Sequence, residues 1–342
     1  MKTLTAAGLA LAGIVFLAAA EPQWEVQGSG VTARLRGVSA VSERVAWASG
    51  AAGTVVRTVD GGSTWTALAV PDAGKLDFRD VDAIGADTAY ILSIGSGAAS
   101  RIYKTTDAGK TWQLQFTNED PKGFFDAMAF WDNERGLVMG DSIDGRFEIL
   151  RTRDGGKTWR RVPTGALPPA LENEGAFAGS GTNVAVVPGG YAWIGTGAAA
   201  RSRVLHTRDY GETWSIAETP VASSASSGIF SVAFRDPRVG LTVGGDYRKE
   251  TETADNAAIS VNGGLTWEAV RGLGGFRSVV AAIPKTPRGW IAVGPSGADV
   301  SMDEGRTWTP IPGTGYHAFA FAPGSRTGWG VGEKGAIGKL IW

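Results

Sequence analysis

The chain has 342 residues, with 50 glycines, no cysteine and a formal net charge of −1. The absence of cysteine excludes disulfides and thiolate chemistry, and the balanced charge gives no basis for binding nucleic acid or an anionic membrane surface. Long helices are not expected, because no stretch after residue 20 keeps an apolar helical period without a Gly or Pro.

The first 20 residues are typical of an export signal. Lys2 precedes an apolar run over residues 6–17, and three alanines at 18–20 form a small-residue cleavage site. The run is short for a membrane span, so an uncleaved anchor is the alternative and the one expected membrane contact. We therefore predict a signal peptide over 1–20 and a single domain over 21–342. The mature protein is expected to be periplasmic or secreted.

One eight-residue phrase, Ser/Thr-x-Asp-x-Gly-x-Thr-Trp, occurs six times along the mature chain. Its copies end in tryptophans that are 47, 47, 55, 53 and 41 residues apart, and they cover 58–65, 105–112, 152–159, 207–214, 260–267 and 301–308. A period of this length, with short apolar runs between the copies, indicates a radial array of β-sheets.

Each phrase is interpreted as a turn between two strands. The Asp side chain can accept backbone hydrogen bonds, the Gly supplies a positive φ, and the Trp anchors the returning strand. The residues expected in this structural role are Asp60, Asp107, Asp154, Asp209, Asn262 and Asp303. In the fifth copy, Asn262 keeps the acceptor without the charge.

The strands between these turns count to seven blades. First strands are expected at 36–41, 77–84, 124–130, 182–187, 230–234, 276–283 and 316–321. A second apolar strand follows each of them, but there are only six turns. Trp24 to Val26 resembles the strand that follows each Thr-Trp pair, so we predict that it supplies the fourth strand of the last blade and closes the ring. The predicted fold is an all-β, seven-bladed β-propeller of four-stranded blades.

The repeated phrase resembles the Asp-box, or bacterial neuraminidase repeat. The resemblance covers essentially the whole mature chain, and with seven blades behind an export signal it is most similar to the photosystem II assembly and stability factor family. It implies that the Asp residues of the phrase are structural and lie away from the ligand. Sialidases are less similar, because they have six blades and an Arg-Ile-Pro motif that this chain lacks.

The longest loops are expected on the face opposite the repeated turns. They lie between second and third strands (140–146, 195–203, 245–256) and between blades (117–123, 163–179, 219–228). Long loops that share one face of a rigid scaffold are where binding usually occurs. We therefore expect the functional face there, centred on blades three to five.

Two functions are compatible with this face. The first is a non-enzymatic propeller that binds a protein or peptide, as the resemblance implies, through Arg203, Arg235, Tyr247, Arg248 and Arg277. The second is a glycan-binding or glycan-hydrolysing propeller, because glycoside hydrolysis needs two carboxyls about 5–9.5 Å apart. The carboxylates considered for it are Asp126, Asp141, Glu174 and Asp246. The sequence favours the binder, and ion pairs with nearby arginines are the structural alternative for these acids.

No cofactor and no metal ion are expected. The chain has only two histidines, His206 and His317, and it contains neither a phosphate-binding loop nor an EF-hand pattern. We expect the protein to be a monomer.

Overall fold

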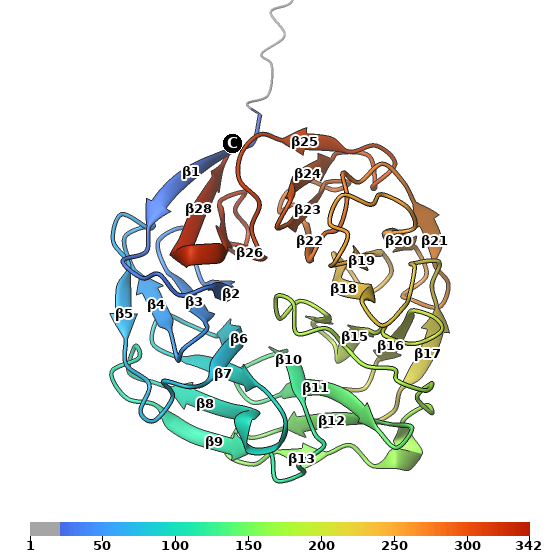
Figure 1. The fold of residues 1–342 in the computed structure, drawn as a ribbon, viewed down its shortest axis with the longest axis horizontal. Helices are drawn as coiled ribbons and strands as arrows, with labels where there is room; N and C mark the ends of the chain where they lie inside the picture. The colour runs from blue at the N-terminus through green and yellow to red at the C-terminus, as the bar shows by residue number, and fades with distance from the viewer. Residues whose placement is uncertain (1–20) are drawn as a thin grey trace, which may run out of the picture.

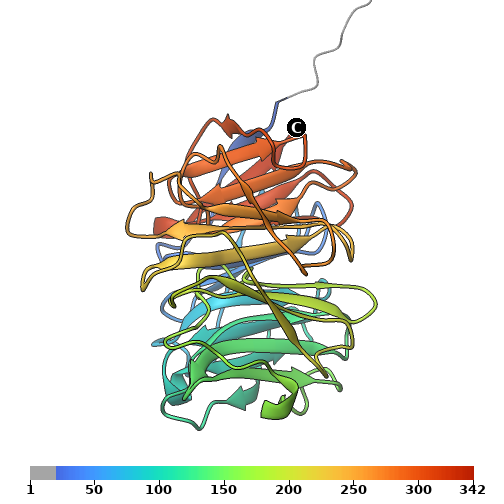
Figure 2. The ribbon, with the colours of Figure 1, turned by 90° about the vertical axis from the view of Figure 1, so that its right-hand side faces the viewer.

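The computed structural model describes residues 21–342, and the predicted signal at 1–20 lies outside the described residues. The chain forms seven four-stranded antiparallel sheets arranged as a ring (Figure 1). Seen from the side, the sheets stack around the axis of a thick disc (Figure 2). The prediction of an all-β, seven-bladed propeller is confirmed.

Each of the first six blades uses four consecutive strands. Blades one to three contain β2 (Leu35–Ala40), β3 (Ala46–Gly50), β4 (Val55–Thr58), β5 (Thr66–Leu68), β6 (Asp77–Ala83), β7 (Ala89–Ile94), β8 (Arg101–Thr105), β9 (Gln113–Thr117), β10 (Phe125–Phe130), β11 (Gly136–Ile143), β12 (Arg146–Thr152) and β13 (Arg160–Arg161). Blades four to six contain β14 (Val184–Val187), β15 (Tyr191–Gly195), β16 (Arg203–Thr207), β17 (Ser215–Glu218), β18 (Ser227–Phe234), β19 (Gly240–Asp246), β20 (Ala257–Ser260), β21 (Glu268–Val270), β22 (Val279–Ala282), β23 (Trp290–Gly294), β24 (Gly297–Ser301) and β25 (Thr309–Ile311).

Blade seven combines the two ends of the described chain. It contains β26 (Ala318–Phe321), β27 (Gly328–Val331), β28 (Ala336–Ile341) and β1 (Gln23–Gly28), and β1 is the outer strand. Trp24 pairs with Leu340 and packs against Tyr316 and Phe319 of the same blade. This is the pairing expected for closure of the ring by the N-terminal strand.

Burial decreases from the middle of each blade to the rim. The second strands β3 and β23 are buried at every residue, because a neighbouring blade covers each of their two faces. The outer strands β5 and β13 are short and mostly exposed. Trp47, Trp193, Trp290 and Trp329 are among the largest fully buried side chains, and they fill the joints between blades. Short 3-10 turns η1 (Gly97–Ala99), η2 (Thr164–Ala166) and η3 (Glu333–Gly335) complete the described elements.

The six repeated phrases form nearly identical turns between third and fourth strands, and we call them the Asp-turns. In the first, Asp60 accepts hydrogen bonds from the Thr64 N–H (2.9 Å), the Thr64 hydroxyl (2.7 Å) and the Thr58 hydroxyl (2.9 Å). Gly62 adopts φ 89°, a conformation that favours glycine. In the fifth, Asn262 accepts the Thr266 N–H and donates to its hydroxyl, so the turn survives without the charge.

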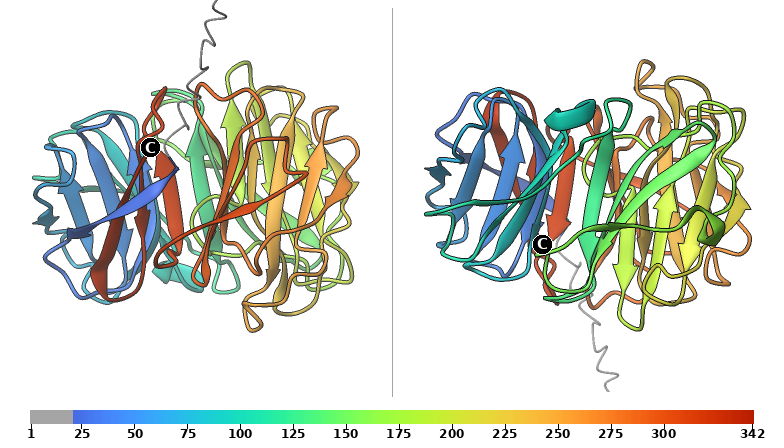
Figure 3. Two further views of the ribbon diagram at one scale, coloured as in Figure 1. Left: turned by 90° about the horizontal axis from the view of Figure 1, so that it is seen from above. Right: turned by 90° about the horizontal axis from the view of Figure 1, so that it is seen from below.

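The Asp-turns share one face of the disc with the turns between first and second strands. The Gly61 N–H donates to the carbonyl of Arg44, and the Gly155 N–H donates to that of Glu134, each within its own blade. Loops between second and third strands and between blades therefore lie on the other face, which we call the loop face (Figure 3). Within residues 21–342, no helix is long and apolar enough to cross a membrane.

Candidate functional site: a central pocket on the loop face

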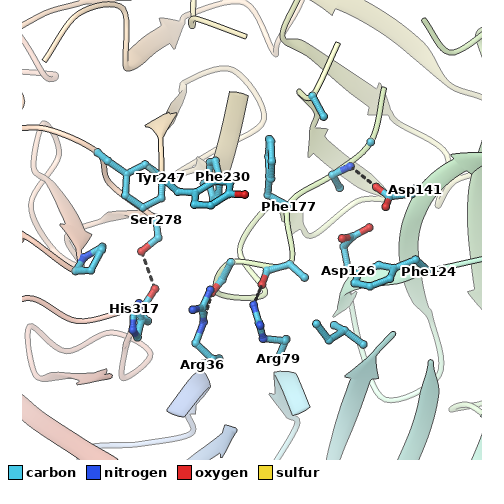
Figure 4. A pocket seen from close by; sticks show the side chains of 18 of the residues that line it. Arg36, Arg79, Phe124, Asp126, Asp141, Phe177, Phe230, Tyr247, Ser278 and His317 are labelled. Atoms are coloured by element: carbon cyan, nitrogen blue, oxygen red, sulfur yellow. Dashed lines mark hydrogen bonds between the residues drawn. The ribbon is translucent and has the colours of Figure 1, made fainter. Parts of the chain in front are cut away.

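A pocket of about 800 Å³ opens on the loop face at the axis of the ring. The segment 173–182, here called the axial loop, precedes β14 and extends into the centre of the propeller, where residues 173–179 line the pocket (Figure 4). Arg36 of blade one donates to the carbonyl of Gly179 (3.0 Å), and Arg79 of blade two donates to that of Ala178 (2.8 Å). On the far side, the Ser180 hydroxyl donates to the Ser278 carbonyl of blade six (2.8 Å).

Four innermost strands carry a β-bulge near their loop-face ends. On β10, Phe125 pairs with Gly140 and Ala127 pairs with Met139, so Asp126 is an extra residue without a partner. The same shift makes Arg36 the extra residue on β2, Arg79 on β6 and Phe230 on β18. A bulge re-aims its extra side chain, and all four of these side chains line the pocket.

The blade-three side of the pocket is acidic, and we call Asp126 and Asp141 the acidic wall. Both side chains lie beside the axial loop (Figure 4). Asp141 accepts the Ala176 N–H (3.1 Å), whereas Oδ2 of Asp126 has no hydrogen-bond partner and the residue is only 1% exposed. Burial raises the pKa of Asp141 to about 6. Burial first, and then the charge of Asp141, raises the pKa of Asp126 well above its usual range.

The neighbouring side of the pocket is basic and comes from blades one and two. Arg34, Arg36 and Arg79 line it, and we call them the basic wall. Burial, followed by the charges of Arg79 and Arg34, lowers the pKa of Arg36 to about 9. His317 bonds to Glu333 at the same side (2.7 Å), and burial lowers its pKa despite that carboxylate.

Aromatic rings form the third side, between blades four and six. Phe177 of the axial loop stacks on Phe230 with ring centroids 4.1 Å apart, and Tyr247 lies edge-on to both. Gly197 forms backbone bridges beside these rings and is closely packed there. A Cβ added at Gly197 would lie 2.6 Å from the Cα of Gly228 and 2.8 Å from the Phe177 ring, so the position requires glycine. Tyr247 is 41% exposed and therefore accessible to a ligand. We call these three rings the aromatic wall.

Two of the arginines selected from the sequence are already paired inside the protein. Arg203 donates from Nε to Glu174 (2.9 Å), which also accepts from the Thr196 hydroxyl (2.7 Å) and is almost fully buried. Arg277 pairs with Asp299 at 2.6 Å, and both are buried. Glu174 belongs to the pocket lining, and its carboxylate faces Arg203. These residues brace the loop face.

Of the remaining predicted residues, Asp246 and Arg248 lie on the loop face and Arg235 lies on the face of the Asp-turns. Asp246 does not line the pocket; it accepts the Arg248 N–H (2.9 Å), which lowers its pKa. Arg248 lies over the Tyr247 ring at 5.6 Å. Arg235 begins the turn between β18 and β19, on the face of the Asp-turns, and pairs with Glu304 at 2.6 Å. The expectation that it belongs to the loop face is wrong, because it follows a first strand rather than a second.

The sequence interpretation missed Arg36, Arg79, Phe177 and Phe230. The sequence does contain a signal for Arg36, Arg79 and Phe230. Each of them follows a large apolar residue near the start of a first strand, as in Leu35-Arg36-Gly37 and Phe78-Arg79-Asp80. The bulges that turn these side chains toward the axis have no comparable signal. Over residues 21–342, no group of three or more His, Asp or Glu side chains is arranged to hold a metal ion.

Comparison with known proteins gives similarity at the level of the fold. No protein-family model and no curated protein sequence matches the chain. A structure of YCF48 bound to D1 peptide aligns with a TM-score of 0.66 and 18% identity, over 93% of this chain and 95% of that one. YCF48 from Cyanidioschyzon merolae aligns with the same TM-score and identity, over 93% and 98% of the two chains. The shared fold is the propeller.

A second kind of propeller is also similar. The GH74 xyloglucanase from Xanthomonas campestris aligns with a TM-score of 0.66 and 15% identity, over 93% of this chain and 53% of the enzyme. Identities this low support the common scaffold and transfer no residue role. The function must therefore be argued from the pocket itself.

Proposed function

We propose that this chain is an exported, monomeric propeller that binds a protein or peptide segment in the central pocket of the loop face. The observation that carries the proposal is the pocket: about 800 Å³ at the axis, with an acidic, a basic and an aromatic wall. This volume is within the usual range for ligand sites. Walls of three different chemistries suit a ligand that carries charged and apolar groups together, as a peptide does.

Two further points support a peptide ligand. YCF48, which has the same fold, has been solved with D1 peptide bound. The repeated phrase also resembles the Asp-box of the photosystem II assembly and stability factor family, and this resemblance is part of the proposal. Tyr247 is the expected anchor, because partly exposed aromatic side chains commonly dominate binding energy.

Selection of random twelve-residue peptides on the purified mature protein tests this function. We expect Tyr247→Ala to weaken binding of the selected peptides about tenfold, as loss of an aromatic anchor usually does. Val261→Ala removes an exposed apolar side chain from the second position of an Asp-turn and should leave binding unchanged. Failure to select any peptide, or equal effects of the two substitutions, would refute the proposed function.

A glycan-active propeller is the second candidate, because Asp126 and Asp141 both line the pocket and have raised pKa values. Raised carboxyl pKa values are typical of general acids in glycoside hydrolysis. Hydrolysis of an oligosaccharide panel that is lost in Asp141→Asn, and retained in Asp246→Asn, would favour this function. Asp246 is a suitable control because it lies outside the pocket lining.

A further inference from the structure

The acidic wall differs from the other buried acids of the loop face. Glu174 and Asp299 are each paired with an arginine. Among the described residues, Asp126 and Asp141 take part in no ion pair, and Oδ2 of Asp126 is buried without any partner. A buried, unsatisfied carboxyl group costs stability. The arrangement therefore leaves two carboxyl groups of the pocket lining without an ion-pair partner.

Arg79, whose charge acts on Asp126, does not neutralise this wall. Arg79 donates from Nε to Asp77 (2.9 Å) and from Nη1 to the Ala178 carbonyl (2.8 Å), so two of its three nitrogens are directed elsewhere. Its charge opposes the rise in the pKa of Asp126 but does not overcome burial. The acidic wall thus keeps room for one more cationic group.

Both carboxyls are held in place by rigid elements. Asp126 is the extra residue of the β10 bulge, and Asp141 follows Gly140 on the paired strand β11, fixed by the Ala176 N–H. Figure 4 shows the two carboxyl groups on the same side of the axial loop, one from each strand. A single cation paired with Asp141 would also act on Asp126, whose pKa responds to the charge of Asp141.

We propose that the acidic wall is a subsite for one basic side chain, arginine or lysine, of the bound peptide. This inference rests on the proposed function and adds the chemistry of the partner. A guanidinium has five donors for two carboxyls, and the rings of Phe177 and Phe230 offer apolar surface for the stem of such a side chain. The basic wall repels a cation, which favours the acidic wall over the side formed by Arg34, Arg36 and Arg79.

A metal ion fits this wall less well than an organic cation. The described residues provide no third carboxylate or histidine in a ligating arrangement with Asp126 and Asp141. Calcium takes six to eight oxygen ligands, and two carboxyls beside an aromatic wall do not supply them. Charge complementarity with aromatic neighbours therefore favours a basic side chain.

The direct test is calorimetric titration of the mature protein with N-acetylarginine amide, and with N-acetylcitrulline amide as its neutral isostere. We expect the arginine probe to bind at least about tenfold more tightly, the usual value of a charge-assisted hydrogen bond. Asp141→Asn and Asp126→Asn should each remove the difference. Asp144→Asn, an exposed acid of the same hairpin that pairs with Lys122 (3.2 Å), should keep it.

Equal affinity for the two probes, absence of binding by both, or a preference that survives in both pocket variants would overturn the subsite. Melting temperatures of all variants separate loss of binding from loss of folding. If random peptides bind through Tyr247 but contain no excess of arginine or lysine, the subsite fails and the proposed function stands. If the arginine probe binds but no peptide is selected, the proposed function fails and the cation subsite stands.

Discussion

The two faces of the propeller use aspartate in opposite ways. In the Asp-turns, each carboxylate accepts several hydrogen bonds from its own turn, and these bonds lower the pKa of Asp60 and Asp107 to about 2. In the pocket, burial raises the pKa of Asp141 to about 6 and that of Asp126 well above its usual range. Satisfied acids stabilise the fold, whereas the acids of the acidic wall are retained at a cost in stability.

The fifth Asp-turn sharpens this contrast. Asn262 makes the same backbone contact as the aspartates, so the turn needs an acceptor and not a charge. At the acidic wall, the charge is what a cationic ligand would require. The chemistry of an aspartate in this fold is therefore set by its position along the blade, and the predictions below test that difference.

The largest effect is expected from removing the strand that links the ends of the ring. Gln27 of β1 accepts hydrogen bonds from the indoles of Trp65 and Trp329 (3.2 Å each) and donates to the Gly61 carbonyl (3.1 Å). Deleting residues 21–27 would break these bonds and expose the edge of β28. We expect a fall in melting temperature larger than for any single substitution, measured by calorimetry. An unchanged melting temperature would show that β1 does not support the Asp-turn face.

A smaller effect of opposite sign is expected at the acidic wall. Asp126→Asn replaces a buried, unsatisfied titratable carboxyl by a neutral amide of nearly the same shape, so it should stabilise the mature protein at pH 8. The expected gain is about 1–3 kcal/mol, the usual cost of an unsatisfied buried polar group. Urea denaturation measures it. A loss of stability would mean that Asp126 is a structural acid like those of the Asp-turns.

The pH dependence of stability should separate the two sets of acids. A carboxyl whose pKa is raised to about 6 in the folded state favours folding below its unfolded pKa, and this contribution is lost as pH rises through 6. Asp141→Asn should therefore reduce the loss of stability between pH 4 and pH 7 by about 1–3 kcal/mol. The Asp-turn acids act in the other direction, because their contribution is lost as pH falls from 4 toward 2.

Other titrating groups make the comparison with the wild type necessary. Asp80 and Asp82 of β6 are buried acids with raised pKa values and remain in the variant. His206 and His317 have lowered pKa values, so they favour folding as pH rises. The difference between the two pH profiles reports on Asp141 and on Asp126, whose pKa the charge of Asp141 raises. Identical profiles would contradict the raised pKa of this carboxyl.

The fold could be predicted from the sequence because each blade repeats the same turn and strand pattern. Six copies of one turn and seven pairs of apolar strands specify the blades, and the missing seventh turn indicates where β1 belongs. The site could be predicted only in part. Loop lengths indicated the face on which the pocket lies, and Asp126, Asp141 and Tyr247 were selected from the sequence and line it. Arg203 and Arg277 were selected as ligand residues, but each forms an ion pair with a buried carboxylate of the protein.

The remaining pocket residues depend on geometry that has no local pattern. Arg36 and Arg79 reach the axis because bulges re-aim them, and Phe177 does so because the axial loop extends into the centre of the ring. Contacts such as Arg36 with Gly179 join residues more than a hundred positions apart. Such contacts follow from the assembled ring and not from any one blade.

One matched pair of substitutions tests the central claim most directly. Asp141→Ala and Asp60→Ala each remove one aspartate, from the acidic wall and from an Asp-turn respectively, and both peptide affinity and melting temperature can be measured on each. We predict that Asp141→Ala weakens binding of a selected peptide about tenfold or more and lowers the melting temperature less than Asp60→Ala does. Asp60→Ala should lower the melting temperature and leave affinity unchanged. The reverse pattern, or equal effects of the two substitutions on both quantities, would contradict the account.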